Sequence, residues 1–283
     1  MITKLVFSGG GVKCFIFLGF IKALEEKNLI KNIDSIIGTS AGSMMAALLC
    51  LDYKYTELEE IFINININNF KNINSENILK FFDNYGIDDG EKFSRIIYIL
   101  LKAKTSNENI TFKELYDLTG KKLIISATCV NTMNIEYFDY INNPSMKIHD
   151  AIMMSICVPM FYKPIEYNGK LYVDGGVIKH YPIEYFKEYK KTTLGIMISG
   201  SMKENNKINN LSDYLYLLFS CQFVNLLKYD YELYKNNTIL IESNISFVDF
   251  DLEYNTKINL IDIGYKKTIN YIESNIFKEY FQI

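Results

Sequence analysis

Gly38, Ser40 and Gly42 form a G-x-S-x-G pattern between a short apolar run and a helix-forming segment. A serine hydroxyl attacks a carbonyl only when the backbone lifts it clear, and a sharp strand-to-helix turn does this. Glycines on both sides remove the Cβ atoms that would collide in such a bend. The pattern indicates a nucleophilic serine, although a serine at an ordinary helix N-terminus gives the same letters.

Three consecutive glycines, Gly9, Gly10 and Gly11, follow an apolar run and precede a helical pattern. Successive unhindered N–H groups of this kind can hold an oxyanion or a phosphate. The spacing excludes a nucleotide loop, because it matches neither G-x-G-x-x-G nor G-x-x-x-x-G-K-[ST]. Lys13 either adds positive charge beside the loop or is a solvated surface lysine. The loop is a candidate oxyanion-binding element, with a simple tight turn as the alternative.

A candidate acid, Asp174, is followed by Gly175 and Gly176. The two glycines let the backbone pass close to another loop, and a carboxylate there can accept the proton of an attacking hydroxyl such as that of Ser40. Asp-Gly is also ordinary turn chemistry, so the motif gains weight only beside the other two. An unperturbed aspartate is a weak base, and burial must therefore raise its pKa towards the working pH.

The elements that position these residues alternate between strand and helix. A strand over 2–7 leads through the glycine loop into a helix over 12–27, and a strand over 34–37 leads through the Ser40 turn into a helix over 43–51. This alternation is typical of a mostly parallel sheet covered by helices, with functional loops at the carboxyl ends of the strands.

The rest of the chain continues the same architecture. Further strands are predicted at 123–130, 135–140, 164–167, 170–173, 193–198 and 238–242, with helices at 54–104, 146–156, 211–234 and 257–275. Asn168-Gly169 is a strong hairpin turn, which leaves Asp174 just beyond a strand end. We expect a three-layer α/β/α fold and a single domain over 1–283, with the motifs in about 1–200 and a helical part over about 201–283.

Composition excludes several functional classes. The formal net charge of −3 lacks the excess of Lys and Arg that nucleic-acid binding needs. The two histidines and five scattered cysteines are too few and too dispersed for a zinc site, and we predict no metal and no cofactor. No run of about 18 apolar residues predicts a transmembrane segment, and the N-terminal run lacks a signal-peptide cleavage site. Unpaired cysteines favour a cytoplasmic location or one peripheral to an intracellular membrane.

The three glycine motifs together resemble the patatin-like phospholipase family: GGGVK at 9–13, GTSAG at 38–42 and DGG at 174–176. The helix text FIFLGFIKALEE resembles the first helix of that family. The segment Ser155-x-x-x-Pro159-x-Phe161-x-x-Pro164 resembles the stretch ahead of its acid. The resemblance covers residues 1 to about 200.

This resemblance implies a patatin-like fold and hydrolysis of fatty acyl esters in phospholipids or related lipids, without a cofactor. It assigns Ser40 as nucleophile and Asp174 as its only catalytic partner. The remaining motif residues would form or support an oxyanion hole: Gly9, Gly10 and Gly11 as donors, and Lys13, Gly38, Gly42, Gly175 and Gly176 as support. Contact with a membrane would be peripheral.

Two departures from the family pattern concern Cys14, where Gly is frequent, and His180, where Asn is frequent. His180 either completes a Ser-Asp-His triad or hydrogen-bonds in its loop as the Asn does. His149 is expected to be a surface or satisfied core residue. The rival functions are an α/β-hydrolase-like esterase that uses Ser40, Asp174 and His180, and a non-catalytic lipid-binding module.

Two other segments bear on lipid contact. The aromatic and Ile-rich stretch from Ile61 to Phe82 is either a mobile cap over an acyl pocket or a fixed helical layer. The apolar stripe of the 211–234 helix either packs in the core or meets a bilayer.

Overall fold

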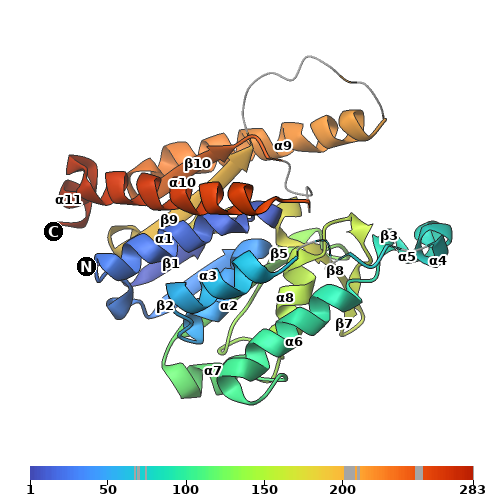
Figure 1. Ribbon diagram of the computed structural model, residues 1–283. Coiled ribbons are helices and arrows are strands. Elements are labelled where there is room, and N and C mark those ends of the chain that lie inside the picture. The colour runs from blue at the N-terminus through green and yellow to red at the C-terminus, as the bar shows by residue number, and fades with distance from the viewer. Residues whose placement is uncertain are drawn as a thin grey trace.

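A central, mostly parallel sheet organises the computed structural model, which describes residues 1–66, 68, 71–73, 75–200, 208, 211–245 and 251–282 (Figure 1). In the described residues its strands run in the order β10-β9-β1-β2-β4-β8-β7, and β5 also pairs with β4. Their bounds are β1 Lys4–Phe7, β2 Ser35–Thr39, β4 Lys122–Cys129, β5 Asn134–Phe138, β7 Ile165–Tyr167, β8 Lys170–Asp174, β9 Thr193–Gly200 and β10 Thr238–Ser243. A separate two-stranded sheet joins β3 (Gly86–Asp88) to β6 (Met160–Tyr162).

Helices cover both faces of the main sheet. They are α1 Phe15–Glu26, α2 Ala41–Cys50, α3 Tyr55–Asn64, α4 Ser75–Leu79, α5 Phe81–Asn84, α6 Glu91–Thr105, α7 Phe112–Thr119, α8 Ile148–Ile156, α9 Leu211–Tyr234, α10 Tyr254–Glu273 and α11 Asn275–Phe281. Alternate residues of β1 face opposite layers: Leu5 and Phe7 join the core that α1, α2 and α8 cover, whereas Val6 packs with residues of the 3₁₀ segment Ile183–Thr192 and of α9. This alternation confirms the predicted three-layer α/β/α fold.

Strands β2 and β8 meet end to end along one edge of β4. Thr39, the last residue of β2, pairs with Ser126, and Asp174, the last residue of β8, pairs with Ala127. The antiparallel β5 occupies the other edge, because it pairs with both Ser126 and Ala127. The register therefore brings the end of β8 to the residue that follows β2, although the two strands are far apart in the sequence.

The C-terminal part of the chain joins the same sheet and core. Strand β10 pairs in parallel with β9, and α10 crosses α1 at Gly19 and Gly264 (Figure 1). A Cβ at Gly19 would stand 2.0 Å from the carbonyl oxygen of Ile261, and one at Gly264 would stand 2.1 Å from that of Ile16. The two backbones thus pack against each other without side chains between them.

Most predicted elements match the structure to within a few residues. The stretch 54–104 was predicted as helical throughout, but this is wrong at β3, which breaks it through pairing with the distant β6. The sequence also did not predict helix α7, which a capping box at Thr111 and Glu114 begins. Of the α9 stripe, the side chains of Leu215, Leu218, Phe219 and Phe223 lie outside the described residues, as does that of Cys221. The other four cysteines are free and buried.

Within the described part of the chain, no helix is long and apolar enough to cross a membrane.

Candidate active site

Ser40 occupies a strained turn between β2 and α2. Its backbone lies at φ 54° and ψ −130°, a region that non-glycine residues rarely adopt. The turn is tight, because a Cβ at Gly38 would stand 2.2 Å from the carbonyl oxygen of Gly42, and one at Gly42 would stand 2.3 Å from that of Ser8. The glycines of the G-x-S-x-G pattern are therefore required by close backbone contacts, as the sequence indicates.

Asp174 lies directly opposite this turn. Asp174 is 6% exposed, and its carboxylate accepts a hydrogen bond from the Gly176 N–H at 2.6 Å. The Ser40 side chain lies close enough to this carboxylate to lower its pKa. Burial raises the pKa of Asp174 to about 6, and the Ser40 side chain and the Gly176 N–H keep it from rising further. A buried carboxylate with this pKa is still ionised at neutral pH and is a stronger base than a free aspartate.

The glycine-rich loop ends β1 beside Ser40. The Gly9 N–H donates to the carbonyl of His180 at 2.9 Å, so this amide is already engaged. In the part of the chain that the structure describes, the amides of Gly10 and Gly11 have no protein acceptor. Of the three predicted donors, these two are the ones available to a developing negative charge.

Lys13 is buried, which differs from the surface alternative left open by the sequence. Its ammonium group donates to the carbonyl of Ser199 at 3.4 Å, and burial lowers its pKa to about 8. The charge therefore stays close to the glycine loop at neutral pH. It also lowers the pKa of the neighbouring His180.

His180 lies against the glycine loop but bonds to the backbone. Its Nε2 lies 3.1 Å from the Ile198 carbonyl oxygen, and a Cβ at Gly9 would stand 2.7 Å from the imidazole ring. Burial lowers its pKa to about 4, and the charge of Lys13 acts in the same direction, so the ring is neutral at neutral pH. Among the described residues, neither Ser40 nor Asp174 forms a hydrogen bond with this ring.

Hydroxyl groups of other residues support the Ser40 turn, a role that the sequence patterns do not reveal. The Ser40 N–H donates to Ser155 Oγ at 2.9 Å, and Thr39 shares a 2.6 Å hydrogen bond with Ser126 Oγ on β4. Ser155 opens the segment that the sequence analysis had matched to the stretch ahead of the acid. Thr39 and Ser126 carry no local signal, because only strand pairing brings them together.

A second group of polar residues lies on α6 and α8. Ser94 Oγ is 2.9 Å from Nε2 of His149, whose Nδ1 is 3.0 Å from the carboxylate of Asp150. The His149 ring is buried and stacks on Tyr98 with 3.7 Å between ring centroids. His149 is thus a satisfied core residue, one of the two states expected for it.

The chain belongs to the patatin-like phospholipase family, whose sequence model matches residues 5–187. It is 29% identical over 264 residues to the probable lipid hydrolase 463L of Invertebrate iridescent virus 6, an alignment that covers 90% of this chain and 84% of that protein. The triacylglycerol lipase ptl2 of Schizosaccharomyces pombe is 28% identical over 164 residues, which are 58% of this chain and 25% of ptl2. These matches identify the chain as a lipid acyl hydrolase by family.

Solved structures share the fold. VipD from Legionella pneumophila superposes with a TM-score of 0.67 at 16% identity, over 96% of this chain and 67% of VipD. The type III effector protein ExoU gives a TM-score of 0.56 at 15% identity, over 96% of this chain and 53% of ExoU. At these identities the likeness concerns the fold alone.

Proposed function

We propose that this chain hydrolyses fatty acyl esters of phospholipids or related lipids through a dyad of Ser40 and Asp174. The observation that carries the proposal is the strained Ser40 turn next to the buried Asp174 carboxylate, whose pKa the Ser40 side chain lowers, beside two unengaged glycine amides. Family membership and the lipid hydrolases among the relatives support the substrate class.

In the first half of the reaction, Ser40 Oγ attacks the acyl carbonyl carbon while its proton passes to the Asp174 carboxylate. The carbonyl oxygen becomes an oxyanion that the amides of Gly10 and Gly11 stabilise. Collapse of this intermediate breaks the bond to the alcohol part of the lipid. The departing oxygen takes the proton from Asp174, which leaves an acyl group on Ser40.

In the second half, water attacks the acyl group and Asp174 accepts a proton from it. The fatty acid leaves, and Ser40 regains its proton from Asp174. The raised pKa of Asp174 suits both steps, because a base near the working pH combines adequate ionisation with adequate basicity. In this scheme His180 does not transfer protons but holds the glycine loop through its backbone contact with Gly9.

The proposed substrates reside in membranes or lipid droplets, so the chain would meet them by peripheral contact. The described cysteines are free and buried, which supports an intracellular, reducing location as part of the proposal.

A fluorophosphonate probe and a soluble chromogenic ester test the nucleophile together. We expect the probe to attach to Ser40, and Ser40→Ala to abolish labelling and lower ester hydrolysis at least about 1,000-fold. Ser94→Ala is the matched control, because the Ser94 hydroxyl contacts the imidazole of His149 in the other serine-containing polar group, and its labelling and rate should stay within about twofold of the parent. Equal hydrolysis by the parent and Ser40→Ala would refute the proposal.

A further inference from the structure

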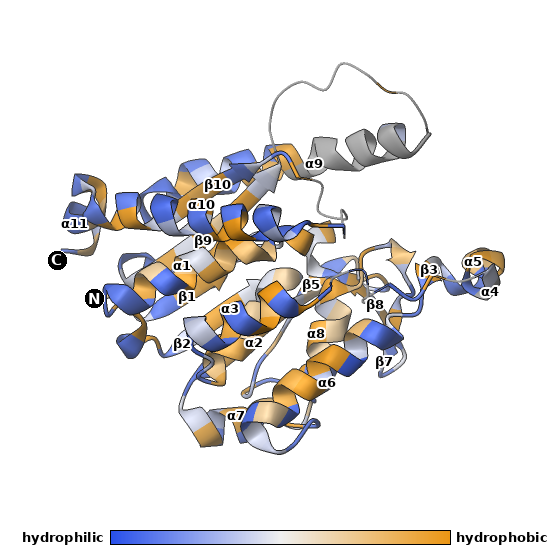
Figure 2. Cartoon of the chain, in the orientation of Figure 1, coloured by the Kyte–Doolittle hydropathy of each residue, from blue (hydrophilic) through white to orange (hydrophobic). Residues whose placement is uncertain are grey.

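Helices α4 and α5 stand away from the rest of the molecule as a protrusion, residues 75–85 (Figure 1). Its side chains are apolar and unusually exposed: Leu79 is 83% exposed and Phe82 is 85% exposed. Ile78 and Tyr85 are also exposed, and we call these four residues the apolar tip. Figure 2 shows hydrophobic residues gathered at these two helices, where little else of the fold is near. Large apolar side chains exposed in such a group mark an interaction site.

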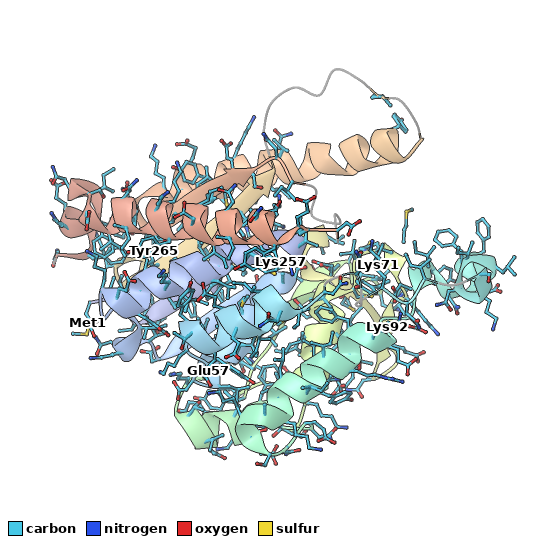
Figure 3. All side chains as sticks on the ribbon, viewed as in Figure 1. Met1, Glu57, Lys71, Lys92, Lys257 and Tyr265 are labelled. Carbon is cyan, nitrogen blue, oxygen red and sulfur yellow. The ribbon has the colours of Figure 1, made fainter. Side chains whose placement is uncertain are left out.

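The base of the protrusion is held by polar contacts. The buried Asp88 of β3 accepts hydrogen bonds from the N–H groups of Gly90 and Asn72, and Lys92 donates to the carbonyl of Lys71 at 2.8 Å. Lys71 and Lys92 lie close to each other in Figure 3 at this base. The exposed apolar groups are thus carried on an anchored element, and their exposure does not come from a detached chain end.

The protrusion is connected to the candidate active site through its second sheet. Strand β3, which follows the tip, pairs in parallel with β6, and β6 begins three residues after Cys157. The carbonyl of Cys157 accepts the N–H of Asp174 at 2.8 Å. The segment that pairs with β3 at the base of the protrusion therefore also contacts the carboxylate-bearing residue of the proposed dyad, which connects the protrusion to the site through β3 and β6.

We propose that the apolar tip inserts into the surface of a lipid bilayer and holds the Ser40 site against it. The inference rests on the proposed function, because that function places the substrate in a bilayer. The tip is convex and apolar, as insertion between lipid headgroups requires. A groove-shaped partner protein would have to enclose it on several sides.

The charges of the protrusion indicate which kind of lipid surface it would bind. Residues 75–85 contain one lysine against Glu76 and Asp83, and the whole chain carries a formal net charge of −3. The protrusion itself therefore carries no excess of positive charge, and apolar burial is the main contribution to the proposed contact. Binding should be as strong on zwitterionic phosphatidylcholine vesicles as on vesicles with added phosphatidylserine, and should change little with salt.

Vesicle flotation of the full chain tests the proposal in the Ser40→Ala background, where the lipid is not consumed. We expect Leu79→Ser/Phe82→Ser to lower the vesicle-bound fraction at least about tenfold, since each side chain loses its transfer from water. The matched control is Leu118→Ser/Ile276→Ser on α7 and α11, which lie far from the tip in Figure 1. Leu118 is 63% exposed, so the control removes comparable apolar surface and should leave flotation unchanged.

The same tip variant with Ser40 intact separates this inference from the proposed function. Its hydrolysis of a soluble short-chain ester should stay within about twofold of the parent, while its hydrolysis of vesicle phospholipid falls with binding. Equal flotation of parent and tip variant, or no flotation of the parent, overturns the inference. An equal loss of soluble-ester hydrolysis also overturns the inference, because a cap over the acyl pocket predicts that loss. A parent protein that is dimeric while the tip variant is monomeric overturns it as well. A parent inactive on every ester refutes the proposed function but leaves the flotation result standing.

Discussion

Ser40 and Ser94 each lie in a polar group that contains a carboxylate. The Ser40 side chain acts directly on the Asp174 carboxylate and lowers its pKa, without a histidine between them. Ser94, His149 and Asp150 instead present the full residue set of a serine-hydrolase triad, with contacts of 2.9 and 3.0 Å. A list of side chains alone would favour the second region.

The backbone reverses that preference. Ser94 lies in the first turn of α6, where its N–H already bonds to the Gly90 carbonyl, and its helix provides no glycine loop beside the hydroxyl. Ser40 stands at a strained turn next to two unengaged amides. A lifted hydroxyl and available N–H groups thus define a candidate nucleophile better than the identity of its side-chain partners does.

The largest expected effect comes from exchanging the carboxylates. Asp174→Asn should lower kcat/KM for a soluble ester about 1,000-fold or more, because the amide cannot accept the serine proton. Asp150→Asn should leave it within about twofold. Steady-state kinetics of both purified variants measures the difference, and comparable losses in the two would remove the distinction between the regions.

Backbone strain at the turn should matter next. In Gly38→Ala the new Cβ would meet the Gly42 carbonyl oxygen at 2.2 Å, so the turn must shift. We expect about 1–3 kcal/mol lower stability and a loss of activity of about 10- to 100-fold. Gly200→Ala is the control, since its Cβ would meet nothing within 4 Å. Thermal melts and ester kinetics report the two effects, and a fully active Gly38→Ala enzyme would show that the turn geometry is dispensable.

Acid should reduce the rate through Asp174. Its pKa of about 6 means that the carboxylate needed as base is lost below that pH, so kcat/KM should fall about tenfold from its plateau by pH 5. The effect on stability has the opposite sign. The pKa of Asp174 in the folded state lies above that of a free aspartate, so ionisation between the two values favours the unfolded state. Asp174→Asn should therefore raise the Tm at pH 8 and change it little near pH 4. A flat rate profile between pH 5 and 7 would contradict this assignment.

The smallest expected effect concerns the two histidines. His180→Ala should keep activity within about tenfold, because the ring bonds to the backbone and not to the dyad, whereas a triad would lose several orders of magnitude. His149→Ala should leave kcat/KM unchanged but destabilise the fold by about 1–3 kcal/mol, since it removes a buried ring with two hydrogen-bond contacts. Kinetics and urea unfolding of both variants separate the two outcomes.

The sequence predicted what local spacing encodes. The strand-turn-helix units at Gly9 and Ser40 follow from glycines at fixed positions, and the α/β/α layers follow from alternating apolar runs. The resemblance to the patatin-like family, now confirmed, came from the same motifs. Their assigned roles stay predictions until the kinetics are measured.

Long-range contacts were beyond sequence reasoning. The crossing of α1 and α10 at Gly19 and Gly264 depends on two glycines that look ordinary within their helices. The hydrogen bond from the Gly9 N–H to the His180 carbonyl and the one from the Ser40 N–H to Ser155 Oγ join segments that are far apart in the sequence. The same holds for the Ser94 group, whose members come from two helices that are separate in the sequence.

The end-to-end arrangement of β2 and β8 makes the candidate site sensitive to local unfolding. β8 adheres to β4 through three residue pairs, at Ala127, Thr128 and Cys129, while β1, β2 and β9 form the longer central ladder. Detachment of the β7–β8 hairpin alone would carry Asp174 away and leave most of the sheet intact. We therefore expect heat to inactivate the protein through a sub-global opening before cooperative melting, and amide hydrogens of β8 to exchange with solvent sooner than those of β1.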